Sequence, residues 1–156
     1  MRIWVDADAC PGLIKEILYR AANRTKIKII LVANQPLTVP SSPFIQRIQV
    51  KAGFDVADGY IVQNLHSGDL VVTADIPLAD LVIGKGGSAL NPRGELYSED
   101  NIKQRLAIRN YSDSLRGSGI NTGGPAKLGK KELVAFANGL DKILTGYIKK
   151  DNKINF

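Results

Sequence analysis

The sequence predicts an α/β fold of three layers, with a central, mainly parallel sheet between helices and a further C-terminal helix. Two observations support this prediction. Short apolar runs alternate with segments of helical period along most of the 156 residues, which is the pattern of βαβ units. Two of these runs also lead directly into an aspartate, at Asp6 and Asp75. A chain of this length can bury one sizeable core, so we expect residues 1–156 to form a single domain.

The first half of the chain contains a long helix among short strands. Pro11 suits the first turn of this helix, and apolar residues follow it at helical spacing as far as Ala21. Prolines and serines between residues 36 and 43 predict a loop. The expected strands of this half are residues 2–6, 27–33 and 46–50.

The second half continues the alternation of strands and helices. An Asn-Pro-Arg-Gly turn at residues 91–94 joins two short extended pieces, and Ser98 can cap the next helix. The Gly-rich segment at residues 117–131 is expected to be a flexible loop. The remaining expected elements are helices at residues 57–65 and 76–82, a strand at 69–74 and a C-terminal helix at about 130–149.

The composition is that of an ordinary globular protein and excludes several classes. Hydrophobic residues make up 44% and charged residues 23% of the chain. No apolar run approaches the ~20 residues that span a bilayer, and the N-terminus lacks the pattern of a secretory signal. We therefore expect a cytoplasmic protein that has no membrane partner. The single cysteine excludes an internal disulfide and a multi-cysteine metal cage.

The net charge of +6 is concentrated near the C-terminal end. Residues 126–156 hold seven lysines against three acidic residues, and the lysines include Lys127, Lys130 and Lys131. Such a stretch can steer a polyanion, for example single-stranded RNA, towards a site. It can also be the solvated face of a helix. The sequence favours this second interpretation, because moderate basicity alone is a weak signal of nucleic-acid binding.

The most informative residues are the aspartates at the ends of expected strands. Asp6 and Asp8 follow the first strand, and Asp75 follows the strand at residues 69–74 in the same way. The carboxyl ends of parallel strands meet at one edge of a sheet, so we expect these carboxylates to lie together there, with Asp58 near them. Mg²⁺ and Mn²⁺ prefer oxygen ligands, so the pattern predicts a metal site. A single aspartate would be better explained as a helix cap or a surface charge, but Asp6, Asp8 and Asp75 together favour the site.

Neighbouring polar residues are candidates for completing this site. Asn34 and Asn91 close apolar segments and are expected to line the same crevice, unless they serve only as turn residues. Arg93 follows a proline in its turn and could either grip a phosphate or stabilise the turn. Asp69 is expected to lie elsewhere, because the six residue steps between it and Asp75 span about 20 Å in a strand.

The residues of this expected site invite a comparison with known families. Asp6, Asp58 and the segment at residues 72–79 resemble the metal-ligand pattern of PIN-like nucleases. A closer resemblance, which covers nearly the whole chain, is to the YaiI/YqxD family of largely uncharacterised bacterial proteins, itself placed among PIN-like folds by similarity. The segments that carry it are DADACP at residues 6–11, GDLVVTADIPLA at 68–79, NPRG at 91–94 and GGP at 123–125.

The resemblance implies a PIN-like fold and metal-dependent cleavage of phosphodiesters. The implied catalytic residues, which are also the implied ligands of Mg²⁺ or Mn²⁺, are Asp6, Asp8, Asp58 and Asp75. Thr73 would support Asp75. PIN-like nucleases often carry a further acid on a later helix, and Asp80 is the nearest candidate here.

Three functions are compatible with these observations, and we rank them in this order. The first is a Mg²⁺- or Mn²⁺-dependent nuclease that acts on RNA, with the lysines near residue 127 guiding the strand. The second is a non-catalytic module that binds metal or nucleic acid. The third is a phosphohydrolase in which Asp6 is the covalent nucleophile and Asp8 the general acid, since Asp-x-Asp after a strand also opens haloacid dehalogenase-like enzymes. Cys10 and Pro11 argue against it, because a glycine and a small polar residue are usual there.

Overall fold

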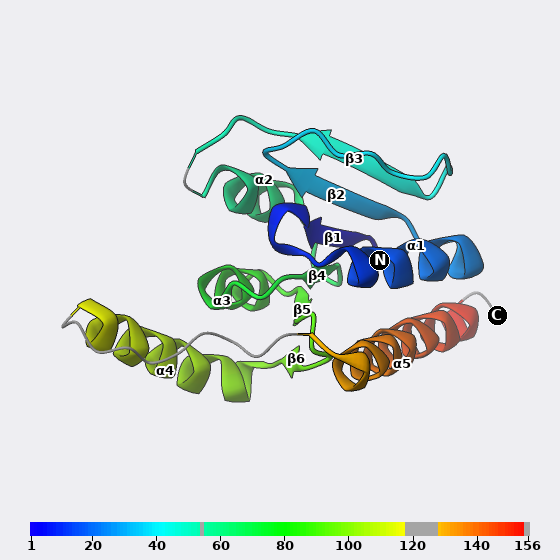
Figure 1. Cartoon of the computed structure of the whole chain (residues 1–156). Coiled ribbons are helices and arrows are strands. Elements are labelled where there is room, and N and C mark those ends of the chain that lie inside the picture. Colours follow the sequence, from blue (N-terminus) through cyan, green and yellow to red (C-terminus); the bar gives the residue numbers. More distant parts are fainter. Residues whose placement is uncertain (54, 118–127, 155–156) are drawn as a thin grey trace.

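The computed structural model describes residues 1–53, 55–117 and 128–154 and has the α/β architecture that the sequence predicts (Figure 1). Within these residues a sheet of six strands lies at the centre. The order of the strands in space is β3-β2-β1-β4-β5-β6, and neighbours are parallel except for β5 and β6. The strands are β1 (Ile3–Asp6), β2 (Ile29–Ala33), β3 (Ile45–Gln49), β4 (Leu70–Val72), β5 (Ser88–Leu90) and β6 (Leu96–Tyr97).

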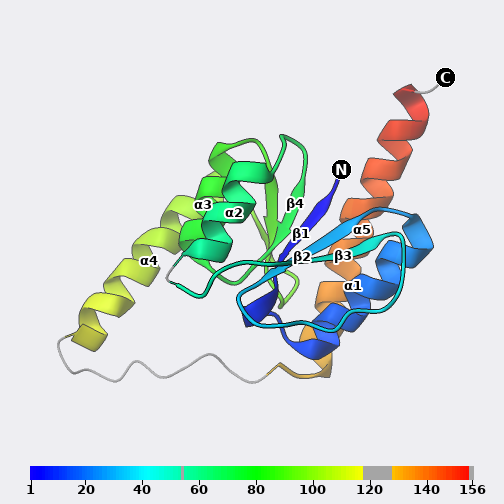
Figure 2. The same ribbon diagram turned by 90° about the horizontal axis from the view of Figure 1, so that it is seen from above.

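Helices cover both faces of this sheet. They are the short 3-10 helix η1 (Ala7–Ala9) and the α-helices α1 (Gly12–Thr25), α2 (Val56–Asn64), α3 (Ile76–Gly84), α4 (Glu99–Gly117) and α5 (Lys130–Ile154). Figure 2 shows α1 and α5 on one side of the strands and α2, α3 and α4 on the other. This arrangement confirms the three-layer prediction and the C-terminal helix.

Two hydrophobic clusters, one on each face of the sheet, hold the layers together. Ile3 and Val5 of β1 belong to the cluster beneath α1 and α5, whereas Trp4 belongs to the cluster beneath α2, α3 and α4. Successive side chains of a strand point to opposite faces. Asp6 therefore falls on the same face as Trp4, which is the face that α2 and α3 cover.

The strand order reverses at β1. The chain runs from β1 through α1 to β2 and β3 on one side, and then returns to place β4 on the other side of β1. In open parallel sheets such a reversal leaves a crevice at the carboxyl ends of the two strands, because the following helices diverge to opposite faces. The crevice here opens after Asp6 and after Val72.

The chain turns more sharply after β1 than the sequence predicts. The helix does not continue directly from the strand: η1 intervenes, and Pro11 is the N-cap residue of α1. This bend separates the two aspartates of the Asp-x-Asp motif, so that Asp6 is buried and Asp8 is exposed.

Other predictions concern the C-terminal half. Ser98 caps α4 as predicted, since its Oγ accepts a hydrogen bond from the N–H of Asn101 at 3.2 Å. α5 is longer than the predicted helix at about 130–149 and extends to Ile154. Most of the segment predicted to be a flexible loop, residues 118–127, lies outside the described residues. In the described part of the chain, no helix combines the length and the hydropathy needed to cross a bilayer.

The turn between β5 and β6 fixes the position of α5. The Oδ1 of Asn91 accepts hydrogen bonds from the N–H groups of Arg93 at 2.9 Å and of Glu95 at 3.0 Å, which closes the turn. Gly94 has a φ of 88°, in the left-handed region, and its backbone lies directly against α5. A Cβ at this position would be 2.4 Å from the carbonyl carbon of Ala135.

We expect Gly94→Ala to destabilise the protein strongly. The new methyl group would overlap backbone atoms of α5, and the residue would also have to keep a positive φ, so we expect a loss of roughly 2–4 kcal/mol in the free energy of unfolding. Urea denaturation measures this loss. Gly146→Ala is the matched control, because a Cβ at Gly146 meets no atom within 4 Å. Equal stabilities of the two variants would contradict the packing role of Gly94.

Candidate active site

Asp6 is buried at the end of β1, with 9% of its surface exposed. Its Oδ2 accepts a hydrogen bond from the Oγ1 of Thr73 at 3.2 Å. Burial raises the pKa of Asp6, the hydrogen bond from Thr73 opposes this change, and the nearby carboxylates of Asp75 and Asp8 add to it. The fold thus holds this carboxylate where its charge is unfavourable unless a positive partner or a proton is present.

Thr73, directly after β4, connects Asp6 to Asp75. Its hydroxyl donates to Asp6 and accepts a hydrogen bond from the N–H of Asp75 at 3.0 Å. Asp75 is the N-cap of α3, and its Oδ1 accepts a hydrogen bond from the N–H of Leu78 at 3.1 Å. The cap fixes the direction of the Asp75 side chain, so that this residue serves the helix and the carboxylate group together.

Asp58 brings a third carboxylate from the first turn of α2. Burial raises the pKa of Asp58 to about 7, with further contributions from repulsion by Asp75, Asp6 and Asp55 and from a side-chain hydrogen bond with Asp75. A carboxyl group with this pKa gains and loses its proton near neutral pH, which is a property of acid–base groups in active sites. We call Asp6, Asp58 and Asp75 the carboxylate cluster.

Asp8 has a different set of contacts. Its side chain accepts hydrogen bonds from the N–H groups of Asn34 at 2.6 Å and of Gln35 at 3.4 Å. It therefore ties η1 to the loop that follows β2, in place of capping the first helix. Asp8 still acts on the cluster electrostatically, since it raises the pKa of Asp6.

A cavity of about 420 Å³ opens beside the carboxylate cluster, and α2, α3 and α4 line it. Asp58 and Asp75 lie in its wall, together with Asp55 of the α2 N-cap. Arg109 of α4 also lines the cavity and brings a cationic side chain to it. Anionic and cationic groups thus face the same space, which suits a ligand that carries phosphate and is bound together with a cation.

The cluster is not a closed metal cage. Within the described residues, no three Asp, Glu, His or Cys side chains converge as a preformed cation site. Mg²⁺ does not require such a cage, because it keeps several waters and is commonly held by one or two carboxylates. The pair Asp58 and Asp75 meets this requirement. Asn34, just after the neighbouring β2, does not line this cavity, and its Oδ1 is buried without a hydrogen-bond partner among the described residues.

The other sequence candidates are distributed over several places. The side chain of Asn91 bonds within its own turn and also donates to the hydroxyl of Tyr97 at 3.3 Å. Arg93 lies 3.6 Å from the carboxylate of Glu132 at the start of α5. Lys127 lies outside the described residues. The substrate-binding roles of these three residues stay predictions.

Two further aspartates lie apart from the cluster. Asp80 forms an ion pair with Lys103 of α4 at 3.0 Å and lines a different cavity. Asp69 lies at the opposite edge of the sheet, as predicted, where it accepts hydrogen bonds from the indole N–H of Trp4 and the N–H of His66. Burial would raise the pKa of Asp69, but these hydrogen bonds and the Arg2 guanidinium lower it overall.

Arg109 is the functional candidate that the sequence analysis missed. A signal existed, because Arg109 lies seven residues after Ile102, which is two helical turns, and Ile102 is buried on the face of α4 that contacts α3. Finding it required knowing that α4 brings Arg109 to the cavity at the cluster, and this depends on tertiary packing.

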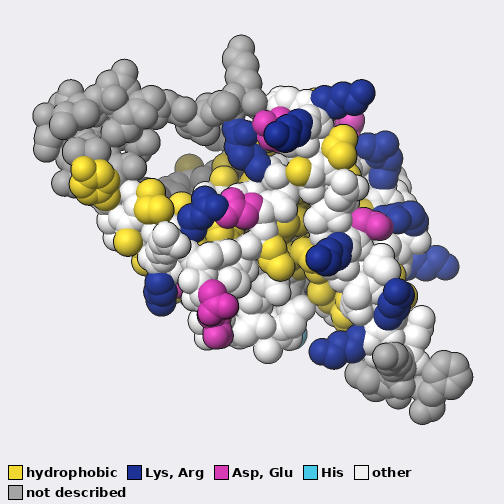
Figure 3. Space-filling model, turned by 90° about the horizontal axis from the view of Figure 1, so that it is seen from below, with side chains coloured by type: hydrophobic (Ala, Val, Ile, Leu, Met, Phe, Trp, Pro, Cys, Tyr) yellow, Lys and Arg dark blue, Asp and Glu magenta, His cyan; other side chains and the backbone are white. Residues whose placement is uncertain are grey.

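The basic residues near the C-terminal end form a surface of their own. Figure 3 shows Lys and Arg side chains spread over the half of one face to which α5 belongs, with few acidic side chains among them. The exposed lysines of α5 are Lys130, Lys131, Lys142, Lys149 and Lys150. α5 packs on the face of the sheet opposite α2 and α3, so this surface is separate from the cavity at the cluster.

The sequence profile of the uncharacterised YaiI/YqxD family matches residues 4–146. The chain belongs to this family. It is similar to the UPF0178 protein of Shewanella sediminis, with 58% identity over 149 residues that cover 96% of this chain and 99% of the relative. The UPF0178 protein of Thioalkalivibrio sulfidiphilus is 60% identical over 144 residues, which cover 92% and 98% of the two chains.

A third relative, the UPF0178 protein of Syntrophotalea carbinolica, is 60% identical over 148 residues, which cover 95% of this chain and 100% of its own. No solved structure matches the chain at a significant level. The residues matched by the family profile begin in β1 and end in α5, so they include the whole carboxylate cluster and Arg109.

We expect Asp58→Asn to raise stability at pH 8 and to leave it unchanged at pH 4. The pKa of Asp58 rises from 3.8 to about 7 on folding, so between these values the folded state holds more protons than the unfolded state, and the free energy of unfolding falls as pH increases. Asparagine has no titratable carboxyl group, so the variant should not lose stability in this way as pH increases. Because the group is partly screened by solvent, we expect a gain of about 1 kcal/mol, or roughly 2–4 °C in Tm.

Thermal unfolding at the two pH values tests this expectation. Asp141→Asn is the control, because Asp141 is an exposed aspartate on α5 that pairs only with Arg24 among its described contacts. A gain of equal size at pH 4 and pH 8 would show that charge repulsion in the cluster is not the cause.

Proposed function

We propose that this protein is a Mg²⁺- or Mn²⁺-dependent nuclease of the PIN-like class that hydrolyses phosphodiesters in single-stranded RNA. The observation that carries this proposal is the carboxylate cluster. Asp6, Asp58 and Asp75 come from β1, α2 and α3, three elements far apart in the sequence, and they meet at the point where the strand order reverses. Maintaining like charges together costs free energy, and bound cations commonly offset such a cost at catalytic sites.

Asp58 and Asp75 are the residues best placed to hold the metal, because both line the cavity, and Asp6 acts on Asp58 through its charge. A bound Mg²⁺ or Mn²⁺ would stabilise negative charge on a phosphoryl oxygen and lower the pKa of a water molecule. The charge of Asp8 raises the pKa of Asp6, while the carboxylate oxygens of Asp8 accept hydrogen bonds from the loop after β2.

The side chains of the chain itself position the substrate and the carboxylates. Arg109, in the wall of the same cavity, can donate hydrogen bonds to phosphate oxygens and so orient the phosphodiester against the carboxylates. Asp58, whose pKa is about 7 in the metal-free protein, would give up its proton when a cation binds beside it. Thr73 keeps Asp6 and Asp75 in fixed positions through its two hydrogen bonds.

The contacts of Asp6 and Asp8 favour the nuclease over an aspartate-nucleophile phosphohydrolase. A covalent nucleophile must reach the phosphorus atom of the substrate. Asp6 is poorly accessible, since only 9% of its surface is exposed, and its Oδ2 accepts a hydrogen bond from Thr73. Asp8, the general acid in that alternative, points its oxygens at the backbone of Asn34 and Gln35. A module that binds metal or nucleic acid without turnover is the remaining alternative, and the next experiment distinguishes it.

We expect the protein with Mn²⁺ to cleave end-labelled single-stranded RNA, and we expect Asp58→Asn and Asp75→Asn to lower the rate at least ~100-fold. The reason is that each substitution removes a charged oxygen ligand from the cluster. Asp141→Asn, on α5, is the matched control and should retain the full rate. EDTA should abolish cleavage in all active variants.

Thermal shift with Mn²⁺ separates the possible outcomes. If Mn²⁺ raises the Tm of the unmodified protein but not of Asp75→Asn, and no RNA is cleaved, the protein is a binding module. If Mn²⁺ raises neither the Tm nor the cleavage rate, the metal-dependent proposal is wrong.

Arg109→Gln should weaken RNA binding while leaving the carboxylate cluster intact. We expect KM to rise about tenfold with a smaller change in kcat, and the slope of log Kd against log salt to decrease by about one, because one phosphate contact is lost. Fluorescence anisotropy with labelled RNA at several salt concentrations measures both effects. Arg20→Gln, on α1 at the opposite face, is the control, and an equal effect of the two substitutions would refute a specific role for Arg109.

A further inference from the structure

A second cavity, of about 570 Å³, lies between α3 and α4 beside the cavity at the carboxylate cluster. Its volume is within the ~300–1,000 Å³ typical of sites for small molecules. Val62 and Leu81 line this cavity and also the cavity at the cluster, so the two spaces adjoin along the same side of α3. α3 has nine residues and is therefore about 14 Å long, and it leads from Asp75 at one end to Lys85 just after the other.

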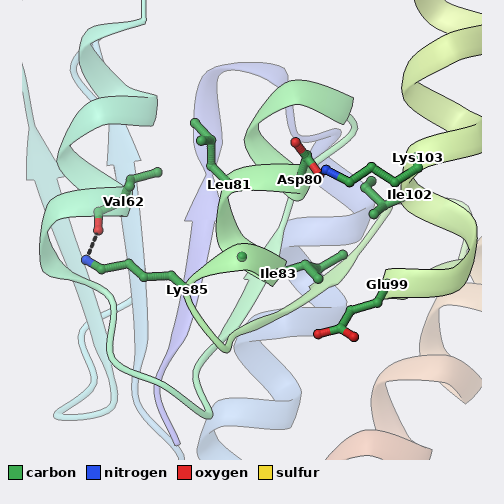
Figure 4. A pocket seen from close by; sticks show the side chains of 9 residues that line it. Val62, Asp80, Leu81, Ile83, Lys85, Glu99, Ile102 and Lys103 are labelled. Carbon is green, nitrogen blue, oxygen red and sulfur yellow. Dashed lines mark hydrogen bonds and ion pairs between the residues drawn. The ribbon is translucent and has the colours of Figure 1, made fainter.

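The lining of this cavity combines apolar walls with polar groups of both signs. Figure 4 shows Leu81 and Ile83 of α3 and Ile102 of α4 around it, with Asp80 and Lys103 reaching towards each other from the two helices. The ammonium group of Lys103 lies 3.0 Å from the carboxylate of Asp80.

Lys85 and Glu99 complete the polar part of the lining. The ammonium group of Lys85 donates to the carbonyl oxygen of Val62, and Glu99 stands in the first turn of α4. The lining thus contains hydrogen-bond donors and acceptors as well as aliphatic side chains. Leu81 remains 56% exposed on this surface, although it is a large apolar side chain.

This combination indicates one kind of occupant. A phosphate alone would require unopposed cationic groups, and here the cationic side chains are matched by Asp80 and Glu99. A lipid chain would not use the charged groups. A nucleobase has apolar faces that can cover Leu81 and Ile83, and an edge with both donors and acceptors that can meet Asp80 and Lys103.

We infer that the cavity between α3 and α4 binds the nucleoside next to the phosphodiester held at the carboxylate cluster. The inference rests on the proposed nuclease function and adds a base-binding subsite to it. Such a subsite selects single-stranded nucleic acid, because a base in this cavity cannot be paired with another strand. Asp80 then has a role in contacting the base, in place of metal binding.

Gly84 allows the subsite to be blocked without disturbing the fold. It lines the cavity, and a Cβ built on it meets no heavy atom within 4 Å. Gly84→Phe should therefore place a ring in the cavity. Gly146→Phe makes the same change on α5, where the space around the glycine is also open. Leu81→Asn is a second variant, and its fold should be intact because Leu81 is largely exposed.

The experiment measures binding of fluorescein-labelled hexaadenylate RNA by anisotropy in Ca²⁺, and cleavage of the same RNA in Mn²⁺. We expect Gly84→Phe and Leu81→Asn to raise Kd about tenfold, the effect of losing one contacted base, and Gly146→Phe to leave it unchanged. If the unmodified protein cleaves the RNA and both cavity variants bind it as tightly, the subsite is wrong and the nuclease proposal stands.

A second measurement separates failure of the subsite from failure of the nuclease. The ¹H–¹⁵N spectrum of the protein is recorded during titration with adenosine 5′-monophosphate. Shifts of the amides of Leu81, Gly84 and Lys103 that are absent in Gly84→Phe would support the subsite even if no RNA is cleaved. If these amides do not move and hexaadenylate does not bind, the inference is overturned.

Discussion

The parallel pairing of β1 with β4 is the constraint on which the site depends. Val5 pairs with Val72, so the residues that follow, Asp6 and Thr73, emerge side by side at the carboxyl edge of the sheet. The chain reaches this pairing only after it has built β2 and β3 on the other side of β1. At this edge of the sheet Asp75 and Asp58 join Asp6 on the face that α2 and α3 cover.

The buried carboxylates at the two edges of the sheet have opposite electrostatic surroundings. At the amino edge, Asp69 is neutralised by Arg2 and by hydrogen bonds from Trp4 and His66, which lower its pKa overall. At the carboxyl edge, Asp6 accepts a hydrogen bond from Thr73, and the carboxylates of Asp75 and Asp8 raise its pKa. The first arrangement stabilises the fold without further partners. The second is unfavourable unless a proton or a cation is present, and such sites are typically functional.

The sequence motifs at the strand end of β1, around β4 and in the turn between β5 and β6 divide into two groups by what they contact. Asp6, Thr73 and Asp75 form the hydrogen-bonded chain of the carboxylate edge. The Asn-Pro-Arg-Gly turn instead fixes α5 against the sheet, through the hydrogen bonds of Asn91 and the close approach of Gly94 to Ala135. A motif can therefore mark a packing requirement as readily as a chemical one, and the contacts of its side chains distinguish the two.

The sequence by itself determined the element types, the strand ends that carry Asp6 and Asp75, and the separation of Asp69 from them, because these follow from local periodicity and chain length. Only the tertiary structure decided that Asp8 turns to the loop after β2, that Asp58 and Arg109 line one cavity, and that a second cavity adjoins the first. These features depend on how α2 and α4 pack against α3. That packing is set by burial of side chains far apart in the chain, which local periodicity does not specify.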